Sequence, residues 1–224
     1  SAGPTATYGI FGVDLRIGAN GHLAFGGFVN NNGANNFAIW TGKPGSIVAL
    51  AVQNDPAPGR PGELLDIFVP SSAAPYWVCP DGSVGFESRV IVSPTVRNAG
   101  VWVGKPGALQ EVAIVNHPAP DLPAATFVDF TASADLANGP FLCNGAGEVV
   151  IRGKMSGGGV TNDNDTAIWS GTPGTLAILA REGGAAGGLA GGIQYDDFTF
   201  SRLSLNAQSQ LCFTVRLRNT SITS

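Results

Sequence analysis

The chain has 224 residues, enough to bury one sizeable core, and only 12% of them are charged, against the ~25% usual for soluble domains. The formal net charge of -4 excludes a phosphate-tracking groove, which needs clustered Lys and Arg, so nucleic acid is not an expected partner. No stretch approaches the ~20 continuous apolar residues of a membrane-spanning helix.

The first part of the chain reads as short strands joined by tight turns. Residues 8–11 form a strand, and Asn20-Gly21 favours the hairpin turn that follows. In residues 22–28 the apolar Leu23 and Phe25 share one face of the next strand. These segments predict an antiparallel sheet.

The following segments continue this pattern. Residues 47–52 are apolar on both faces, which predicts a strand between two layers. The Asp-Pro-Ala-Pro-Gly of residues 55–59 predicts a rigid loop without regular pairing, because proline lacks the backbone donor. Residues 64–68 then resume a strand that closes the unit.

One segment, Ile-Trp-Thr-Gly-Lys-Pro-Gly at residues 39–45, occurs three times. Its copies are Val-Trp-Val-Gly-Lys-Pro-Gly at 101–107 and Ile-Trp-Ser-Gly-Thr-Pro-Gly at 168–174. Proline followed by glycine suits a type II turn, in which the glycine adopts a positive φ. The large tryptophan at a fixed place predicts a packing layer between sheets. The structural positions of the repeat are Trp40, Trp102, Trp169, Gly45, Gly107 and Gly174.

The copies of this segment divide the chain into repeats of about four strands with no helical pattern. The predicted fold is therefore all-β, a propeller-like array of about three and a half four-stranded repeats in one domain, 1–224. The alternative is a pseudo-threefold β-barrel or prism. The repeats span about 8–68, 69–130 and 131–198, with a partial repeat at 199–224.

The combination of I-W-x-G-x-P-G, an apolar strand, D-P-A-P-G and a D-x-F or D-F strand resembles repeats of secreted or surface-anchored bacterial proteins of unknown function. The resemblance covers nearly the whole chain. It implies a propeller-like fold and a secreted or cell-surface location, and it implies no catalytic residues. The chain departs from the pattern at His117, where the repeat has Asp, and in the glycine-rich loop of residues 183–188.

Two groups of carboxylates are candidate sites. Asp66, Asp129 and Asp197 recur beside the aromatic residue of each closing strand, where they could line a channel or bind cations, or simply face outward. Asp163 and Asp165, in the run Asn-Asp-Asn-Asp, offer hard oxygen ligands for calcium. The run lacks the glycine and the closing glutamate of a calcium loop, so calcium is a weak candidate and no other cofactor is expected.

The cysteines and histidines indicate no reactive centre. Cys79, Cys143 and Cys212 have no zinc-ligand spacing and permit at most one internal disulfide, and buried apolar thiols are the simpler interpretation. His22 and His117 occupy different repeat positions, and no Gly-x-Ser-x-Gly elbow accompanies either. The chain is therefore predicted not to be an enzyme.

The partial fourth repeat carries the functional prediction. It lacks a Trp strand and the buried strand after it, so its strand 211–217 is expected to leave an open edge at Leu211, Phe213 and Val215. Arg216 is the single residue of this strand that would hinder pairing with another strand. The leading hypothesis is a secreted structural protein whose subunits form a homo-oligomer, filament or surface layer. The alternative is a propeller that binds a cell-surface glycan or other ligand. A fragment of a longer repeat array would also explain the missing strands.

Overall fold

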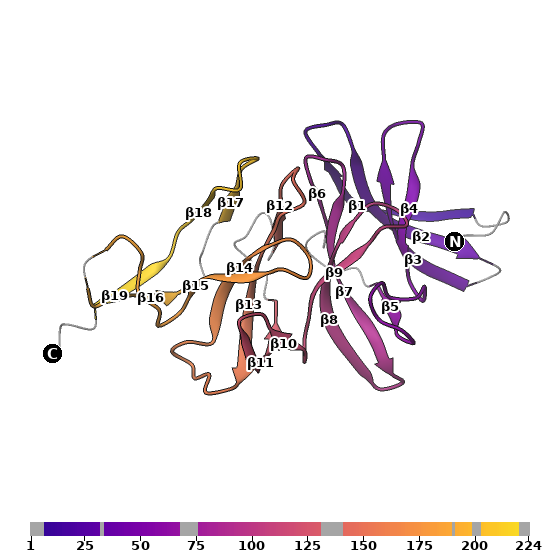
Figure 1. The fold of residues 1–224 in the computed structure, drawn as a ribbon. Helices are drawn as coiled ribbons and strands as arrows, with labels where there is room; N and C mark the ends of the chain where they lie inside the picture. The colour runs from indigo at the N-terminus through magenta and orange to yellow at the C-terminus, as the bar shows by residue number, and fades with distance from the viewer. Residues whose placement is uncertain are drawn as a thin grey trace. The chain divides into compact units, whose positions relative to one another are not determined.

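A computed structural model describes residues 7–31, 34–67, 76–130, 141–189, 191–198 and 203–219 of the chain (Figure 1). These residues form β-strands and turns, so the all-β prediction is confirmed. No helix that could cross a membrane occurs among them. The chain divides into two compact units, Ser1–Ile114 and Val115–Ser224, and the division falls inside the second predicted repeat.

The first unit begins with a four-stranded antiparallel sheet in the order β1-β2-β3-β4. Its strands are β1 (Thr7–Ile17), β2 (Leu23–Asn31), β3 (Ala34–Gly42) and β4 (Val48–Val52). The repeated segment forms the end of β3 and the turn into β4. In that turn Ser46 N donates to the Lys43 carbonyl and Gly45 has φ 86°, the geometry that the Pro-Gly pair predicts.

The second sheet of this unit has the order β5-β7-β8-β9, with β6 also paired to β7. Its strands are β5 (Leu64–Asp66), β6 (Tyr76–Val78), β7 (Val84–Ser93), β8 (Val96–Gly104) and β9 (Gln110–Ile114). The sequence placed residues 64–68 at the end of the first repeat. Leu64 pairs with Ile91, so β5 opens the second sheet; Phe68 lies outside the described residues.

The core of the first unit joins residues of both its sheets. Ile39 and Ala51 of the first sheet belong to the same buried cluster as Phe86 and Trp102 of the second. A smaller cluster around Trp40 packs on the first sheet. Each strand therefore directs alternate residues to one face or the other, as the pleat requires.

The second unit repeats this order of strands. Its large sheet runs β10-β11-β13-β14-β15, with β12 also paired to β13. The bounds are β10 (Pro118–Ala119), β11 (Leu122–Asp129), β12 (Phe141–Cys143), β13 (Val149–Gly157), β14 (Thr166–Gly171) and β15 (Ala177–Arg181).

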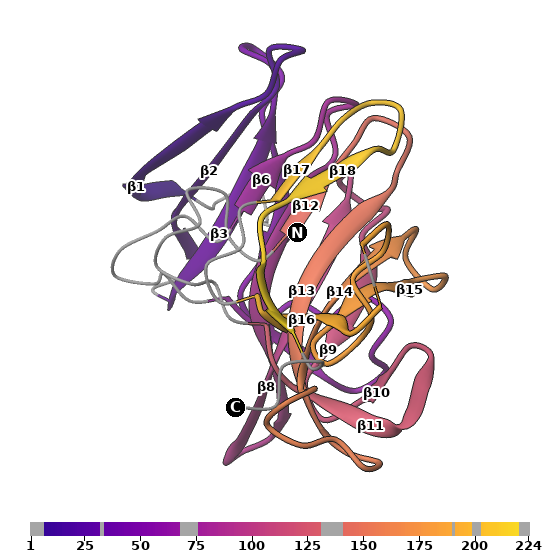
Figure 2. The same ribbon diagram turned by 90° about the vertical axis from the view of Figure 1, so that its left-hand side faces the viewer.

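Two small sheets complete the second unit, with β16 (Ile193–Asp197) pairing β19 (Arg216–Asn219), and β17 (Leu203–Leu205) pairing β18 (Leu211–Phe213). The predicted terminal strand 211–217 is thus two strands. The β17–β18 hairpin lies beside β12, as Figure 2 shows. It packs with β13, β14 and β15 around the buried Val150, Ile168 and Ala180.

Candidate functional site

The tryptophans of the second and third copies are anchored to the proline loop that precedes them. Trp102 Nε1 donates to the Pro58 carbonyl at 3.2 Å, and Trp169 Nε1 donates to the Pro120 carbonyl at 3.1 Å. Both side chains are 0% exposed, and Trp40 of the first copy is 6% exposed. The repeated tryptophans therefore fill cores, and none of the three offers a surface on which a ligand could stack.

Both glycines of the repeated segment are required by its backbone. The last glycine of each copy, Gly45, Gly107 or Gly174, has φ between 78° and 86°. The glycine that follows the tryptophan, Gly42, Gly104 or Gly171, also has positive φ, and a Cβ there would lie 2.3 to 2.6 Å from a backbone oxygen across the turn. These positions set the shape of the turn and carry no chemistry of their own.

The three loops that precede the closing strands share one backbone hydrogen bond in spite of their different sequences. Leu65 N donates to the Asp55 carbonyl, Phe127 N to the His117 carbonyl and Tyr195 N to the Gly184 carbonyl. Residues 55–59 form a loop, as predicted, and one isolated bridge joins Pro56 to Leu64. Proline is tolerated here because these ladder bonds come from its neighbours. The departures at His117 and in the glycine-rich loop keep this hydrogen bond.

The recurring carboxylates belong to a cross-strand charge pattern. Each faces a basic residue in the register of a neighbouring strand, in the pairs Asp66–Arg89, Asp129–Lys154 and Asp197–Arg216. The Arg89 Nη2 atom lies 3.0 Å from Asp66 Oδ2, and the Arg216 Nη2 atom lies 3.2 Å from Asp197 Oδ2. Asp66 and Asp197 are therefore paired with arginines, whereas Lys154, the register partner of Asp129, forms its ion pair with Asp165.

Two of these carboxylates also stabilise a buried arginine. Arg152 is 2% exposed and donates from Nη1 to the Phe198 carbonyl at 2.6 Å. Burial lowers the pKa of its guanidinium, and the negative charges of Asp197 and Asp129 act in the opposite direction. Burial also raises the pKa of Asp129, against the effects of a hydrogen bond from Phe130 N and of the charges on Lys154 and Arg152. The cluster is therefore a structural element of the second unit.

The calcium candidates do not converge. Asp165 is 6% exposed, and its carboxylate accepts from Thr166 at 2.9 Å and lies 3.0 Å from Lys154 Nζ. The Asp163 side chain is 80% exposed and its nearest cation, Arg218, is 3.8 Å away. Across the described ranges, no group of three or more His, Cys, Asp or Glu side chains could hold a metal ion.

The Lys-Pro-Gly turn of the second copy is linked to the hairpin turn before it. Asp81 Oδ1 accepts from Ser83 N at 3.0 Å and from Ser83 Oγ at 2.6 Å, and Asp81 Oδ2 lies 3.3 Å from Lys105 Nζ. Burial acts to raise the pKa of Asp81, but these hydrogen bonds and the Lys105 charge outweigh it and the pKa is lowered. The carboxylate is therefore held ionised as a turn-capping group.

The cysteines differ from their predicted state. Cys79 and Cys143 are disulfide-bonded, whereas Cys212 is an exposed free thiol. The interpretation of all three as buried apolar thiols was therefore wrong. Sequence spacing could not show this, because a disulfide depends on the distance between Cα atoms in the fold.

The predicted assembly edge lies on β18 and the residues after it. The side chains of Leu211, Phe213 and Val215 are half-buried and pack on the core of the second unit. Asn206 N donates to the Gln210 carbonyl at 3.1 Å, so by antiparallel alternation Leu211 and Phe213 direct their backbone groups away from β17. None of the described strands pairs with that second edge of β18.

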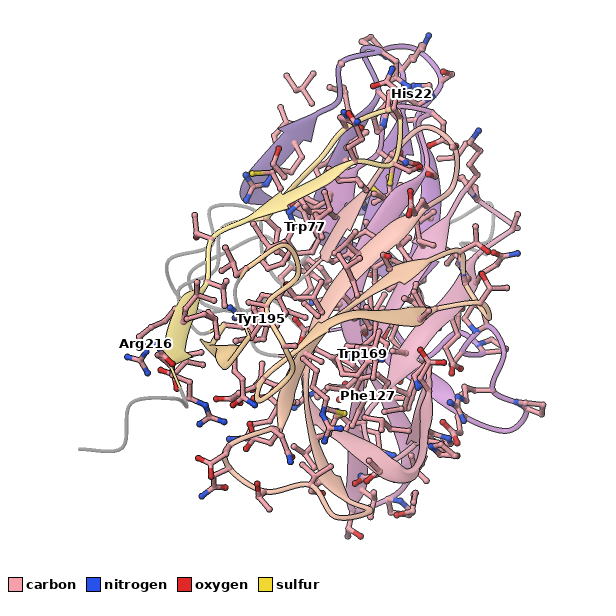
Figure 3. All side chains as sticks on the ribbon, turned by 60° about the vertical axis from the view of Figure 1, so that its left-hand side comes forward. His22, Trp77, Phe127, Trp169, Tyr195 and Arg216 are labelled. Carbon is pink, nitrogen blue, oxygen red and sulfur yellow. The ribbon has the colours of Figure 1, made fainter. Side chains whose placement is uncertain are left out.

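A cavity of about 220 Å³ lies between this hairpin and the large sheet of the second unit. Its apolar lining includes Leu179 of β15, Tyr195 of β16 and Phe213 of β18, and its polar lining includes Glu148 and Ser170. Figure 3 shows Tyr195 close to the strand that carries Arg216. The sequence assigned Phe213 to a strand edge and missed this cavity. The available signal was the absence of a fourth Ile-Trp-x-Gly segment after Phe198.

The fold and these sites define an all-β protein whose repeated tryptophans are buried and whose strand β18 has an edge that no described strand pairs. The model of a family of unknown function, DUF7453, matches residues 2–224, so the chain belongs to that family. No curated protein and no solved structure matches the chain.

Proposed function

We propose that the protein is a non-enzymatic extracellular structural protein whose subunits associate through an open strand edge into a filament or surface assembly. The observation that carries the proposal is the second edge of β18. The strands at the equivalent place, β2, β7 and β13, are each paired on both sides, whereas no described strand pairs with that edge of β18. Open edges of this kind pair readily with a strand of another chain.

The finer architecture belongs to the same proposal. The two sheets of the first unit contribute to one buried core. The large sheet and the two small sheets of the second unit contribute to another. The same order of strands recurs in each large sheet. A propeller-like array of stacked repeats accounts for this recurrence, because each sheet can then bury both of its faces against its neighbours.

The extracellular location is supported by the cysteines. Cys79 and Cys143 are disulfide-bonded, and disulfides persist mainly in oxidising compartments outside the cytosol. Alkylation of the native protein, followed by mass spectrometry, should label Cys212 alone. Labelling of Cys79 or Cys143 without reduction would remove this support.

Self-association is tested by light scattering and negative-stain microscopy over a range of protein concentrations. The background variant is Cys212→Ser, which removes the exposed thiol and any intermolecular disulfide through it. The edge variant is Cys212→Lys, because lysine blunts strand edges in natural proteins. The Ser variant should gain mass with concentration and the Lys variant should stay monomeric. A monomeric Ser variant at the highest concentration would refute the assembly.

Binding of a cell-surface glycan is the second candidate, and the cavity favours it. Tyr195 gives an aromatic ring, and Glu148 and Ser170 give polar groups, a combination found in small-ligand sites. A glycan array should then retain the protein, and a Tyr195→Ala variant should bind less. Absence of retention by any glycan would count against this candidate and leave the assembly proposal untouched.

A further inference from the structure

The first unit shows what occupies the space between two successive sheets. The Trp102 side chain stacks on Phe86, with ring centroids 5.8 Å apart and an interplanar angle of 22°. It lies in the same buried cluster as Leu50 of the preceding sheet and donates to the Pro58 carbonyl of the preceding loop. Three elements therefore make a seat for the indole: an aromatic ring, a leucine and a loop carbonyl.

Two of these elements have equivalents around the cavity of the second unit. Phe86 and Phe213 are equivalent, because the pair Phe86–Tyr76 and the pair Phe213–Leu203 occupy the same register position in their hairpins. Leu50 and Leu179 also occupy equivalent positions. Each immediately precedes an alanine that pairs with the isoleucine before the repeated tryptophan: Ala51 pairs with Ile39, and Ala180 pairs with Ile168. Both Phe213 and Leu179 line the cavity.

The third element is the loop carbonyl. Pro58 follows Ala57, whose backbone N donates to the Glu63 carbonyl, and Gly187 follows Ala186, whose backbone N donates to the Ile193 carbonyl. Ala57 and Ala186 are 4% and 6% exposed. The Gly187 carbonyl thus occupies the position of the indole acceptor.

The exposed fractions of two equivalent leucines show that the corresponding site in the second unit is open. Leu50, in the same buried cluster as Trp102, is 6% exposed, whereas its equivalent Leu179 is 48% exposed. The cavity beside it measures about 220 Å³. An apolar cavity of ~150 Å³ is large enough to bind benzene, so a bicyclic indole fits the available space.

We propose that this cavity binds the tryptophan of a hairpin of the same repeat type, supplied by a second polypeptide. The incoming strand pairs with the outer edge of β18 and places its tryptophan opposite Phe213, as Trp102 lies opposite Phe86. Its indole packs against Leu179 and donates to the Gly187 carbonyl. This inference rests on the proposed function, because it names the segment that the open edge receives.

The test uses a fluorescein-labelled peptide with the sequence of residues 164–182, which includes one complete Trp strand and the strand after it. Fluorescence anisotropy should show saturable binding to the protein. Replacing the peptide's tryptophan by alanine should weaken binding about thirtyfold, the effect of losing a buried aromatic anchor. Absence of binding, or equal binding of the two peptides, would overturn the proposal.

Two protein variants locate the binding. Leu179→Ser changes the cavity wall, and Val48→Ser is its control, because both side chains are 48% exposed and Val48 lies in the first sheet. The first variant should bind the peptide at least about tenfold more weakly, and the second as the wild type does. Equal binding by both variants would place the peptide elsewhere.

The same measurements separate this inference from the proposed function. If the peptide binds in the expected manner but the protein stays monomeric at all concentrations, the seat exists and the assembly proposal fails. If the protein assembles, yet assembly is unchanged by Leu179→Ser and by excess peptide, the assembly stands and the seat fails.

Discussion

Truncation of Trp102 tests whether the repeated tryptophan holds two sheets together. The side chain is fully buried and donates one hydrogen bond to the Pro58 carbonyl. Trp102→Ala removes the whole ring and should lower the free energy of unfolding by about 3 to 5 kcal/mol. Trp102→Phe removes that hydrogen bond, worth about 1 kcal/mol, and about two carbon groups at ~0.8 kcal/mol each, so we expect a loss of about 2 to 3 kcal/mol.

Urea unfolding followed by circular dichroism measures both losses. Val96→Ala, on the same strand but 44% exposed, is the control and should change stability by less than about 0.5 kcal/mol. Trp169 makes the equivalent hydrogen bond, and its ring centroid lies 4.9 Å from that of Phe127. Trp169→Phe should therefore lower the free energy of unfolding by a similar amount. A Trp102→Phe protein as stable as the Val96→Ala protein would refute the role of this contact.

Three further predictions concern the turns and the charges of the first unit. Gly107→Ala should cost about 1 kcal/mol in thermal unfolding, since φ is 78° and nothing obstructs a Cβ, whereas Gly104→Ala should cost more because its Cβ would lie 2.3 Å from a backbone oxygen. A double-mutant cycle on Arg60 and Glu111, joined by two 2.6 Å hydrogen bonds, should give a coupling of about 1 kcal/mol, and additive losses would contradict it. Asp81→Asn should destabilise at pH 7. Because the folded-state pKa of Asp81 is below 3.8, this difference should shrink as pH falls below that value, and a pH-independent difference would contradict the assignment.

The features that sequence analysis predicted are those set by local chemistry. The Pro44-Gly45 turn follows from the restricted φ of proline and the free φ of glycine, and the strands follow from alternating apolar residues. Neither depends on knowing which strand pairs with which. The all-β class and the turn positions could therefore be obtained from one sequence.

The errors concern long-range pairing, which local patterns do not specify. Residues 64–66 have the same strand character whether they close the first sheet or open the second, and only the register with Ile91 decides between the two. The disulfide-bonded state of Cys79 and the cavity beside Phe213 likewise arise from residues far apart in the sequence. A repeat pattern shows that positions are equivalent, but it does not show which copies meet.

The contact between the tryptophan and the preceding loop explains how one repeat depends on the next. Trp102 donates to the Pro58 carbonyl in the loop between β4 and β5, and Trp169 donates to the Pro120 carbonyl in the turn between β10 and β11, so each of these tryptophans depends on the loop that precedes it in the chain. Stability in such an array is the sum of intrinsic terms and nearest-neighbour terms. The seat at Gly187 has the acceptor, the leucine and the aromatic ring, whereas no described tryptophan fills it. In the second and third copies the tryptophan segment is therefore the part that binds the preceding loop.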